Sequence, residues 1–170
     1  MRFFSKPSFE PEASVLFVCL GNICRSPTAE AVFRTATERA GLSKRMRVDS
    51  AGIGDWHVGL PPDSRAIQAA KQRGYDLSSI RGRQFEIADF SRFGWIIAMD
   101  EANLKALNEM KPAEFDGRLA LLLDFAPQLG EREIPDPYFG SPEGFERVLD
   151  LMEPAMAGLV VEVQAGISRR

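Results

Sequence analysis

Two cysteines and an arginine stand within one short stretch of the sequence. Cys19 and Arg25 are separated by five residues, and Cys24 is one of those five. A thiolate can attack an electrophile, a guanidinium can bind two oxygens of an anion, and paired cysteines can form a disulfide or bind a metal. The stretch is therefore compatible with three kinds of site: a metal-binding site, a disulfide and a catalytic nucleophile.

The composition of the chain narrows these alternatives. It contains only two cysteines and one histidine, which is too few for a disulfide framework and leaves almost no ligands for a zinc site. We therefore expect a reducing, cytoplasmic environment, and charged residues interrupt any apolar stretch near the N-terminus that would form a signal peptide. The net charge of −3 gives no general electrostatic reason to bind nucleic acid or a membrane surface.

Strand-like and helix-like patterns alternate along the chain, whose 170 residues suit one domain. We expect a flexible N-terminal extension over residues 1–13 and a single domain over residues 14–170. Strands are predicted at residues 14–20, 46–52, 94–99 and 118–125, although the leucines of the last run would also suit a helix. Helices are predicted from Ser26 to about residue 40, and at residues 61–74, 100–109 and 145–165.

This alternation predicts an α/β fold in three layers, with a parallel sheet covered by helices on both faces. Ligands of such sheets bind beyond the carboxyl ends of the strands. The loop that holds Cys19 follows the first predicted strand and lies at one of these ends. The topology therefore favours a binding role for this loop.

The loop has the residues of an anion-binding site. Gly21 and Asn22 adopt positive φ more readily than other residues, so the loop can turn successive backbone N–H groups inward. The following helix adds its positive N-terminal end, where we expect Ser26 to act as the cap, and Arg25 adds a fork of donors. The positive potential of the helix N-terminus and Arg25 also stabilises Cys19 as a thiolate. A thiolate at this position predicts in-line attack on a phosphate ester and a phosphocysteine intermediate.

Such a reaction also needs an acid for the leaving oxygen and a base for the attacking water. Asp136 is the candidate, because prolines on both sides stiffen the loop that carries it. Tyr138 follows closely and offers an aromatic wall for a flat substrate ring. The alternative is that Asp136 is simply a turn residue, since Asp beside Pro is common in turns.

Taken together, the chain resembles the low-molecular-weight protein tyrosine phosphatases over nearly its whole length after Ala13. The most specific match is "VCLGNICRSPTAEAVF", from Val18 to Phe33. Four shorter motifs follow in the expected order: "DSAG" at 49–52, "DW" at 55–56, "MDEANL" at 99–104 and "DPYFG" at 136–140. The resemblance implies a four-stranded parallel sheet and a phosphatase that needs neither metal nor cofactor.

The resemblance also implies a role for each matching residue. Cys19 is the nucleophile, Arg25 binds phosphate and stabilises the transition state, and Asp136 is the general acid and base. The remaining positions form the phosphate-binding loop (Leu20, Gly21, Asn22, Ile23, Cys24 and Ser26), its support (Ser50) and the pocket wall (Trp56 and Tyr138). Ser26 would bind the Cys19 thiolate, and Cys24 would trap oxidised Cys19 as a reversible disulfide. The implied partner is a phosphotyrosine protein, with a tyrosine kinase as one candidate.

Two residues depart from the family pattern. Ile80 stands where many members have a histidine that supports the loop asparagine, so we expect a different supporting network. Phe139 replaces the second of two tyrosines, which argues against phosphorylation of a tyrosine pair as a control. His57, the only histidine, is expected near the pocket mouth without a catalytic role.

Three rival functions remain. Phosphoarginine phosphatases are close relatives, but a small hydroxyl residue tends to mark them where this chain has Ile23, so phosphotyrosine is favoured. Arsenate reductases share the loop but need further cysteines, and none follows Cys24. A non-catalytic phosphate-binding module would be expected to lose Cys19, Arg25 or Asp136, and all three are present.

Overall fold

Strand β1 (Ala13–Cys19) is buried on both faces and forms the centre of the molecule. Because side chains alternate along a strand, Val15 and Phe17 pack into one hydrophobic cluster, and Leu16 and Val18 pack into another. The continuous apolar run in the sequence reflects these two clusters. Cys19 ends the strand on the first cluster's side.

Three further strands complete an all-parallel sheet: β2 (Met46–Gly52), β3 (Trp95–Ala98) and β4 (Arg118–Leu121). Their spatial order is β2-β1-β3-β4. The chain passes from β1 to β2 on one side and then returns to β3 on the other side. The carboxyl end of β1 therefore lies where the strand order reverses, which is the usual ligand position in open α/β sheets.

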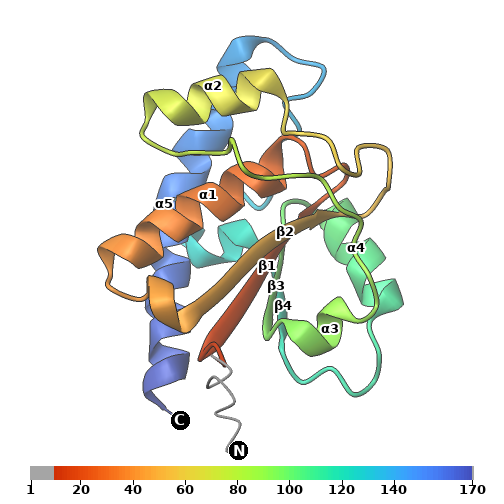
Figure 1. The fold of residues 1–170 in the computed structure, drawn as a ribbon, viewed down its shortest axis with the longest axis vertical. Helices are drawn as coiled ribbons and strands as arrows, with labels where there is room; N and C mark the ends of the chain where they lie inside the picture. The colour runs from red at the N-terminus through yellow and green to blue at the C-terminus, as the bar shows by residue number, and fades with distance from the viewer. Residues whose placement is uncertain (1–9, 170) are drawn as a thin grey trace, which may run out of the picture.

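Helices cover both faces of the sheet, which confirms the predicted three-layer α/β fold (Figure 1). On one face lie the long helices α1 and α5, with α2 beside them, and on the other face lie α3 and α4. The helices are α1 (Arg25–Arg39), α2 (Ser64–Gln72), α3 (Asp89–Arg92), α4 (Glu101–Met110) and α5 (Pro142–Ser168). Short 3₁₀ turns are η1 (Ser43–Arg45), η2 (Leu122–Phe125) and η3 (Pro127–Leu129).

The fourth strand and the last helix differ from the predicted ranges. The strand stops at Leu121, and the rest of the leucine run forms η2, where the Asp124 carboxylate accepts a hydrogen bond from the Leu121 N–H at 3.2 Å. Helix α5 extends three residues beyond the predicted range at each end. It packs tightly on η2, because a Cβ on Gly158 would lie 2.0 Å from the Phe125 carbonyl oxygen.

Helix α2 is shorter than predicted because its start is defined by a cap. The Asp63 carboxylate accepts a hydrogen bond from the Arg65 N–H at 2.9 Å, and the two prolines before Asp63 stay outside the helix. The short helix α3 was not predicted, and it brings Phe90 into the second hydrophobic cluster.

The structure is a computed structural model that describes residues 10–169, so most of the predicted N-terminal extension lies outside the described residues. Within the described part of that extension, Glu12 forms an ion pair with Arg45 at 2.6 Å, and Ala13 opens β1. No helix among residues 10–169 is both long enough and apolar enough to cross a membrane.

Candidate active site

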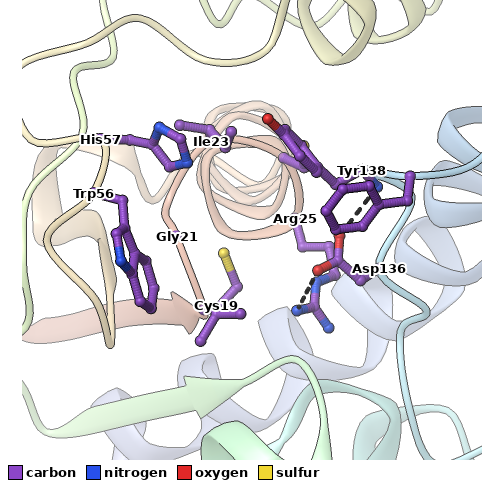
Figure 2. Close-up of a pocket in the computed structure, with 11 residues that line it drawn as sticks. Cys19, Gly21, Ile23, Arg25, Trp56, His57, Asp136 and Tyr138 are labelled. Carbon is purple, nitrogen blue, oxygen red and sulfur yellow. Dashed lines mark hydrogen bonds and ion pairs between the residues drawn. The ribbon is translucent and has the colours of Figure 1, made fainter.

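A pocket of about 230 Å³ opens beyond the carboxyl end of β1 (Figure 2). It gathers residues from three loops that are far apart in the sequence. Trp56 and Tyr138 line the pocket and lie on opposite sides of its mouth. The lining residues are Cys19, Leu20, Gly21, Ile23, Cys24, Arg25, Trp56, His57, Asp136, Tyr138 and Phe139.

The Cys19 sulfur makes two polar contacts with the residues that follow it. Its Sγ lies 3.0 Å from the Ser26 hydroxyl and 3.3 Å from the backbone nitrogen of Asn22, which donates to it. The side chain is almost fully buried, with 3% of its surface exposed, yet it lines the pocket. The sulfur is therefore held in a fixed position by its loop and faces the pocket.

The N-terminus of α1 faces the pocket without a side-chain cap. The predicted cap at Ser26 is wrong: α1 starts at Arg25, the cap position belongs to Cys24, and no side chain caps the helix there. The Ser26 hydroxyl turns instead toward Cys19 and Asn22. The leading N–H groups of a helix have no partner within the helix, so this end is suited to binding an anion.

Asn22 holds the loop in shape from beneath the pocket. Its φ of 56° is the only positive value at a non-glycine position among residues 10–169. Its Nδ2 donates to the hydroxyls of Ser26 at 2.8 Å and Ser50 at 3.0 Å, and its Oδ1 accepts from the Arg83 N–H at 3.0 Å. The side chain is buried and every polar atom of its amide is used.

The backbone N–H of Arg83 supports the Asn22 side chain, the role that many family members give to a histidine at the position of Ile80. Ile80 is partly buried and packs against the main hydrophobic cluster. The Arg83 N–H meets Asn22 because the segment around it lies beside the end of β2, where Gly52 N–H donates to the Arg83 carbonyl at 2.9 Å. On its other side Gly52 lies against the Cys19 loop, and this contact requires glycine, because a Cβ on Gly52 would lie 2.9 Å from the carbonyl carbon of Gly21.

Glu30 extends the same network and was missed by the sequence analysis. The Ser50 hydroxyl donates to Glu30 Oε2 at 2.6 Å, and Arg34 donates to Glu30 Oε1 at 2.7 Å. Burial raises the pKa of the Glu30 carboxyl, although the hydrogen bonds from Ser50 and Arg34 oppose that shift. A glutamate on the inner face of a helix is the only sign of this role in the sequence.

Arg25 is fixed at the base of the pocket by three oxygens. Its Nη1 donates to Asp100 Oδ2 at 2.6 Å and to the Ile134 carbonyl at 3.0 Å, while its Nη2 lies 3.6 Å from Asp136 Oδ2. Burial would lower the pKa of the guanidinium, but the Cys19 sulfur and the two carboxylates outweigh it and raise that pKa. The contact of Asp100 with Arg25 was not predicted from the sequence, because the position of Asp100 before a helix predicts only a cap. Asp100 also caps α4, because its carboxylate accepts a hydrogen bond from the N–H of Asn103.

Asp136 stands beside Arg25 in the loop before α5, with nearly half of its side chain exposed. The N–H of Tyr138 donates to its Oδ1 at 3.1 Å. Arg65 secures this loop, because its Nη2 donates to the Tyr138 carbonyl at 2.9 Å while its guanidinium pairs with Asp63. The N–H of Asp63 in turn donates to Ile23 at 2.8 Å, so the Asp136 loop and the Cys19 loop are connected.

Trp56 reaches the pocket because a glycine makes room for it. A Cβ on Gly54 would lie 1.9 Å from the indole ring, so the ring lies directly over the Gly54 backbone. The indole keeps 65% of its surface exposed. His57 lines the pocket beside Gly21, at the predicted position near the mouth.

Cys24 is buried and, like Cys19, is a free thiol. Burial raises the pKa of the Cys24 thiol to about 12, with further contributions from the charges of Asp63, Cys19 and Asp136. Cys24 therefore remains protonated at neutral pH. Within residues 10–169 no three His, Cys, Asp or Glu side chains are grouped so that they could hold a metal ion.

The whole domain matches proteins of one family. The model of the family described as low molecular weight phosphotyrosine protein phosphatase matches residues 14–169. A putative low molecular weight protein-tyrosine-phosphatase of Synechocystis is 42% identical over 88% of this chain and 95% of its own length. A low molecular weight protein-tyrosine-phosphatase of Streptomyces coelicolor is 42% identical over 92% of this chain and 96% of its own length.

Solved structures agree with the sequence comparison. A protein tyrosine phosphatase of Entamoeba histolytica superposes with a TM-score of 0.87 at 38% identity, covering 91% of this chain and 98% of that one. The arginine phosphatase of Drosophila superposes with a TM-score of 0.82 at 34% identity, covering 87% of this chain and 96% of that one. This chain, with its Cys-x5-Arg loop at the switch point of a parallel sheet, belongs to the low molecular weight phosphotyrosine protein phosphatase family.

Proposed function

We propose that this protein hydrolyses phosphotyrosine in proteins through a phosphocysteine intermediate. The observation that carries the proposal is the meeting of Cys19, Arg25 and Asp136 in one pocket, at the uncapped N-terminus of α1. In this scheme the thiolate and the phosphate share one set of donors. Arg25 binds two phosphate oxygens, and the loop from Leu20 to Cys24 binds the others through backbone N–H groups.

The reaction has two steps. The Cys19 sulfur attacks phosphorus, the S–P bond forms as the ester P–O bond breaks, and Asp136 gives its proton to the leaving tyrosine oxygen. Asp136 then takes a proton from a water that attacks the phosphocysteine, which releases inorganic phosphate and restores the thiolate. The place of Asp136 on the open side of the pocket, across from the buried sulfur, supports this assignment.

The pocket wall supports an aromatic substrate. Trp56 and Tyr138 face each other across the mouth, so a phenyl ring would lie between two aromatic side chains. Ile23 adds an apolar contact within the lining. Phosphoarginine is the second candidate, because the similar Drosophila structure is that of an arginine phosphatase.

We also propose a protective role for Cys24. A peroxide would oxidise Cys19 to a sulfenic acid, which would condense with the Cys24 thiol to give a disulfide and water. This reversible state prevents further oxidation to sulfinic acid. Free thiols are typical of proteins in a reducing compartment, so we propose that this protein acts in the cytosol. The partners would be phosphotyrosine proteins, with a tyrosine kinase as one candidate.

The first test compares a phosphotyrosine peptide with the matched phosphoarginine peptide, using wild type and Cys19→Ser in the presence of EDTA. Phosphotyrosine turnover that survives EDTA and is lost in Cys19→Ser would support the proposal. Inorganic phosphate should still bind to this variant, which shows that the site is intact. Faster turnover of the phosphoarginine peptide would show that phosphoarginine, not phosphotyrosine, is the substrate. Turnover by Cys19→Ser would refute the role of Cys19 as nucleophile.

A second test concerns the acid. Asp136→Ala should lower kcat by about 10²- to 10⁴-fold, the usual contribution of a general acid or base. The loss should be greatest with aryl phosphates whose leaving phenol has a high pKa, because those leaving groups depend most on a proton. The diagnostic quantity is kcat/KM, which reports the steps up to release of the phenol, and an equal loss of kcat/KM for all leaving groups would contradict the role of Asp136 as acid.

A further inference from the structure

Large hydrophobic side chains are exposed mainly around the mouth of the pocket. Eight such side chains are exposed among residues 10–169, and six of them belong to the loops that form the pocket. The other two, Ile87 and Val161, lie away from it. The six are Leu20, Trp56, Val58, Leu60, Tyr138 and Phe139. We refer to the four of them that line the pocket, Leu20, Trp56, Tyr138 and Phe139, as the apolar rim.

Phe139 is the most exposed member of the apolar rim. Its side chain is 96% exposed, and its ring contacts Tyr138 edge-on, with the ring centroids 4.8 Å apart. A phenyl group that is almost entirely in water contributes little to the core. Apolar groups gathered beside a binding pocket mark a surface that another molecule covers.

The charges at the pocket disfavour acidic neighbours of the phosphotyrosine. Among residues 10–169, Arg25 is the only Lys or Arg that lines the pocket, and it is buried and engaged by Asp100 and Asp136. The nearby Arg65 is paired with Asp63. A carboxylate next to the phosphotyrosine would therefore approach the exposed Asp136 without gaining a free cation from the lining.

From this distribution we propose that the apolar rim binds the residues next to the phosphotyrosine, and that it selects segments in which those residues are large and apolar. The proposal rests on the phosphotyrosine activity proposed above. Its occupant is a substrate segment, because the rim is continuous with the pocket that takes the phosphorylated side chain. We assign the contact with the neighbouring side chain to Phe139, because it is the most exposed member of the apolar rim and its ring packs edge-on against Tyr138.

The test uses two phosphotyrosine peptides that differ only beside the phosphotyrosine, one with Leu and Phe there and one with Glu and Asp. The measured quantity is the ratio of their kcat/KM values, which should favour the apolar peptide in wild type. Phe139→Ser should lower this ratio by about tenfold, the effect expected for losing roughly half of a buried phenyl surface. Ile87→Ser and Val161→Ser remove exposed apolar side chains elsewhere on the surface and should leave the ratio unchanged.

The outcomes separate this inference from the proposed function. A simple aryl phosphate has no neighbouring residues, so failure of wild type to hydrolyse it would refute the phosphatase proposal itself. Turnover of the aryl phosphate together with equal kcat/KM values for the two peptides would overturn the role of the apolar rim. A ratio that favours the apolar peptide but is unchanged in Phe139→Ser would overturn the assignment of Phe139.

Discussion

Replacing Asn22 tests whether the loop beneath the phosphate site is held by one amide. The Asn22 side chain makes three hydrogen bonds: those to Ser26 and Ser50 are buried, and the one from the Arg83 N–H is partly buried. Each such bond contributes about 1 kcal/mol, and the positive φ adds about 1 kcal/mol of strain for alanine. We therefore expect Asn22→Ala to lower the free energy of unfolding by about 4 kcal/mol, a large part of the stability of a domain.

Asn22→Gly separates the loss of the hydrogen bonds from the strain of the positive φ. Glycine loses the same hydrogen bonds but accepts a φ of 56° without strain, so its loss should be about 1 kcal/mol smaller than that of alanine. Asn108→Ala is the matched control, because Asn108 is exposed on α4 and its replacement should change the free energy by less than about 0.5 kcal/mol.

Equilibrium unfolding in urea measures all three variants, with the free energies taken from the midpoints at a common slope. Inhibition by inorganic phosphate should also weaken in both Asn22 variants, because the loop N–H groups lose their fixed positions. A loss below about 1 kcal/mol for Asn22→Ala, or a greater loss for glycine than for alanine, would refute the reasoning.

Three further predictions follow from burial and close packing. Because burial raises the pKa of Cys24 to about 12, its labelling by iodoacetamide in a Cys19→Ser protein should be slow at pH 8 and still be rising at pH 10, as read by mass spectrometry. Gly158→Ala should destabilise the fold by about 2 kcal/mol in urea, although alanine is the better helix former, because its Cβ would meet the Phe125 carbonyl; a stabilised variant would contradict this packing. The folded protein holds the Glu30 proton more tightly than the unfolded chain, so the stability due to this group is present below pH 4.5 and is lost as the pH rises through the higher folded pKa. The free energy of unfolding of wild type minus that of Glu30→Gln should therefore fall from pH 4.5 upward, and a difference that rises with pH would show that the carboxylate is stabilised on folding.

The sequence alone was sufficient for the fold class and the family. Both are confirmed, because they depend on patterns that act over short distances. The apolar run of β1 indicates a strand buried on both faces, and the alternation of strands and helices leaves few topologies. The spacing of Cys19 and Arg25 places both side chains in one loop and the first turn of one helix, so their meeting in the pocket needs no long-range contact. The catalytic roles assigned to the pocket residues stay predictions.

Tertiary structure decided which side chains support the site. Ser26 has the local preference of a helix cap, yet its hydroxyl binds Cys19 and Asn22, because the loop brings a sulfur and an amide within reach. Glu30 and Asp100 carry no local pattern that distinguishes them from an ordinary helical glutamate and an ordinary cap. Their roles arise because separate segments meet at the carboxyl ends of neighbouring strands, and a buried polar group must find its partner wherever packing places one.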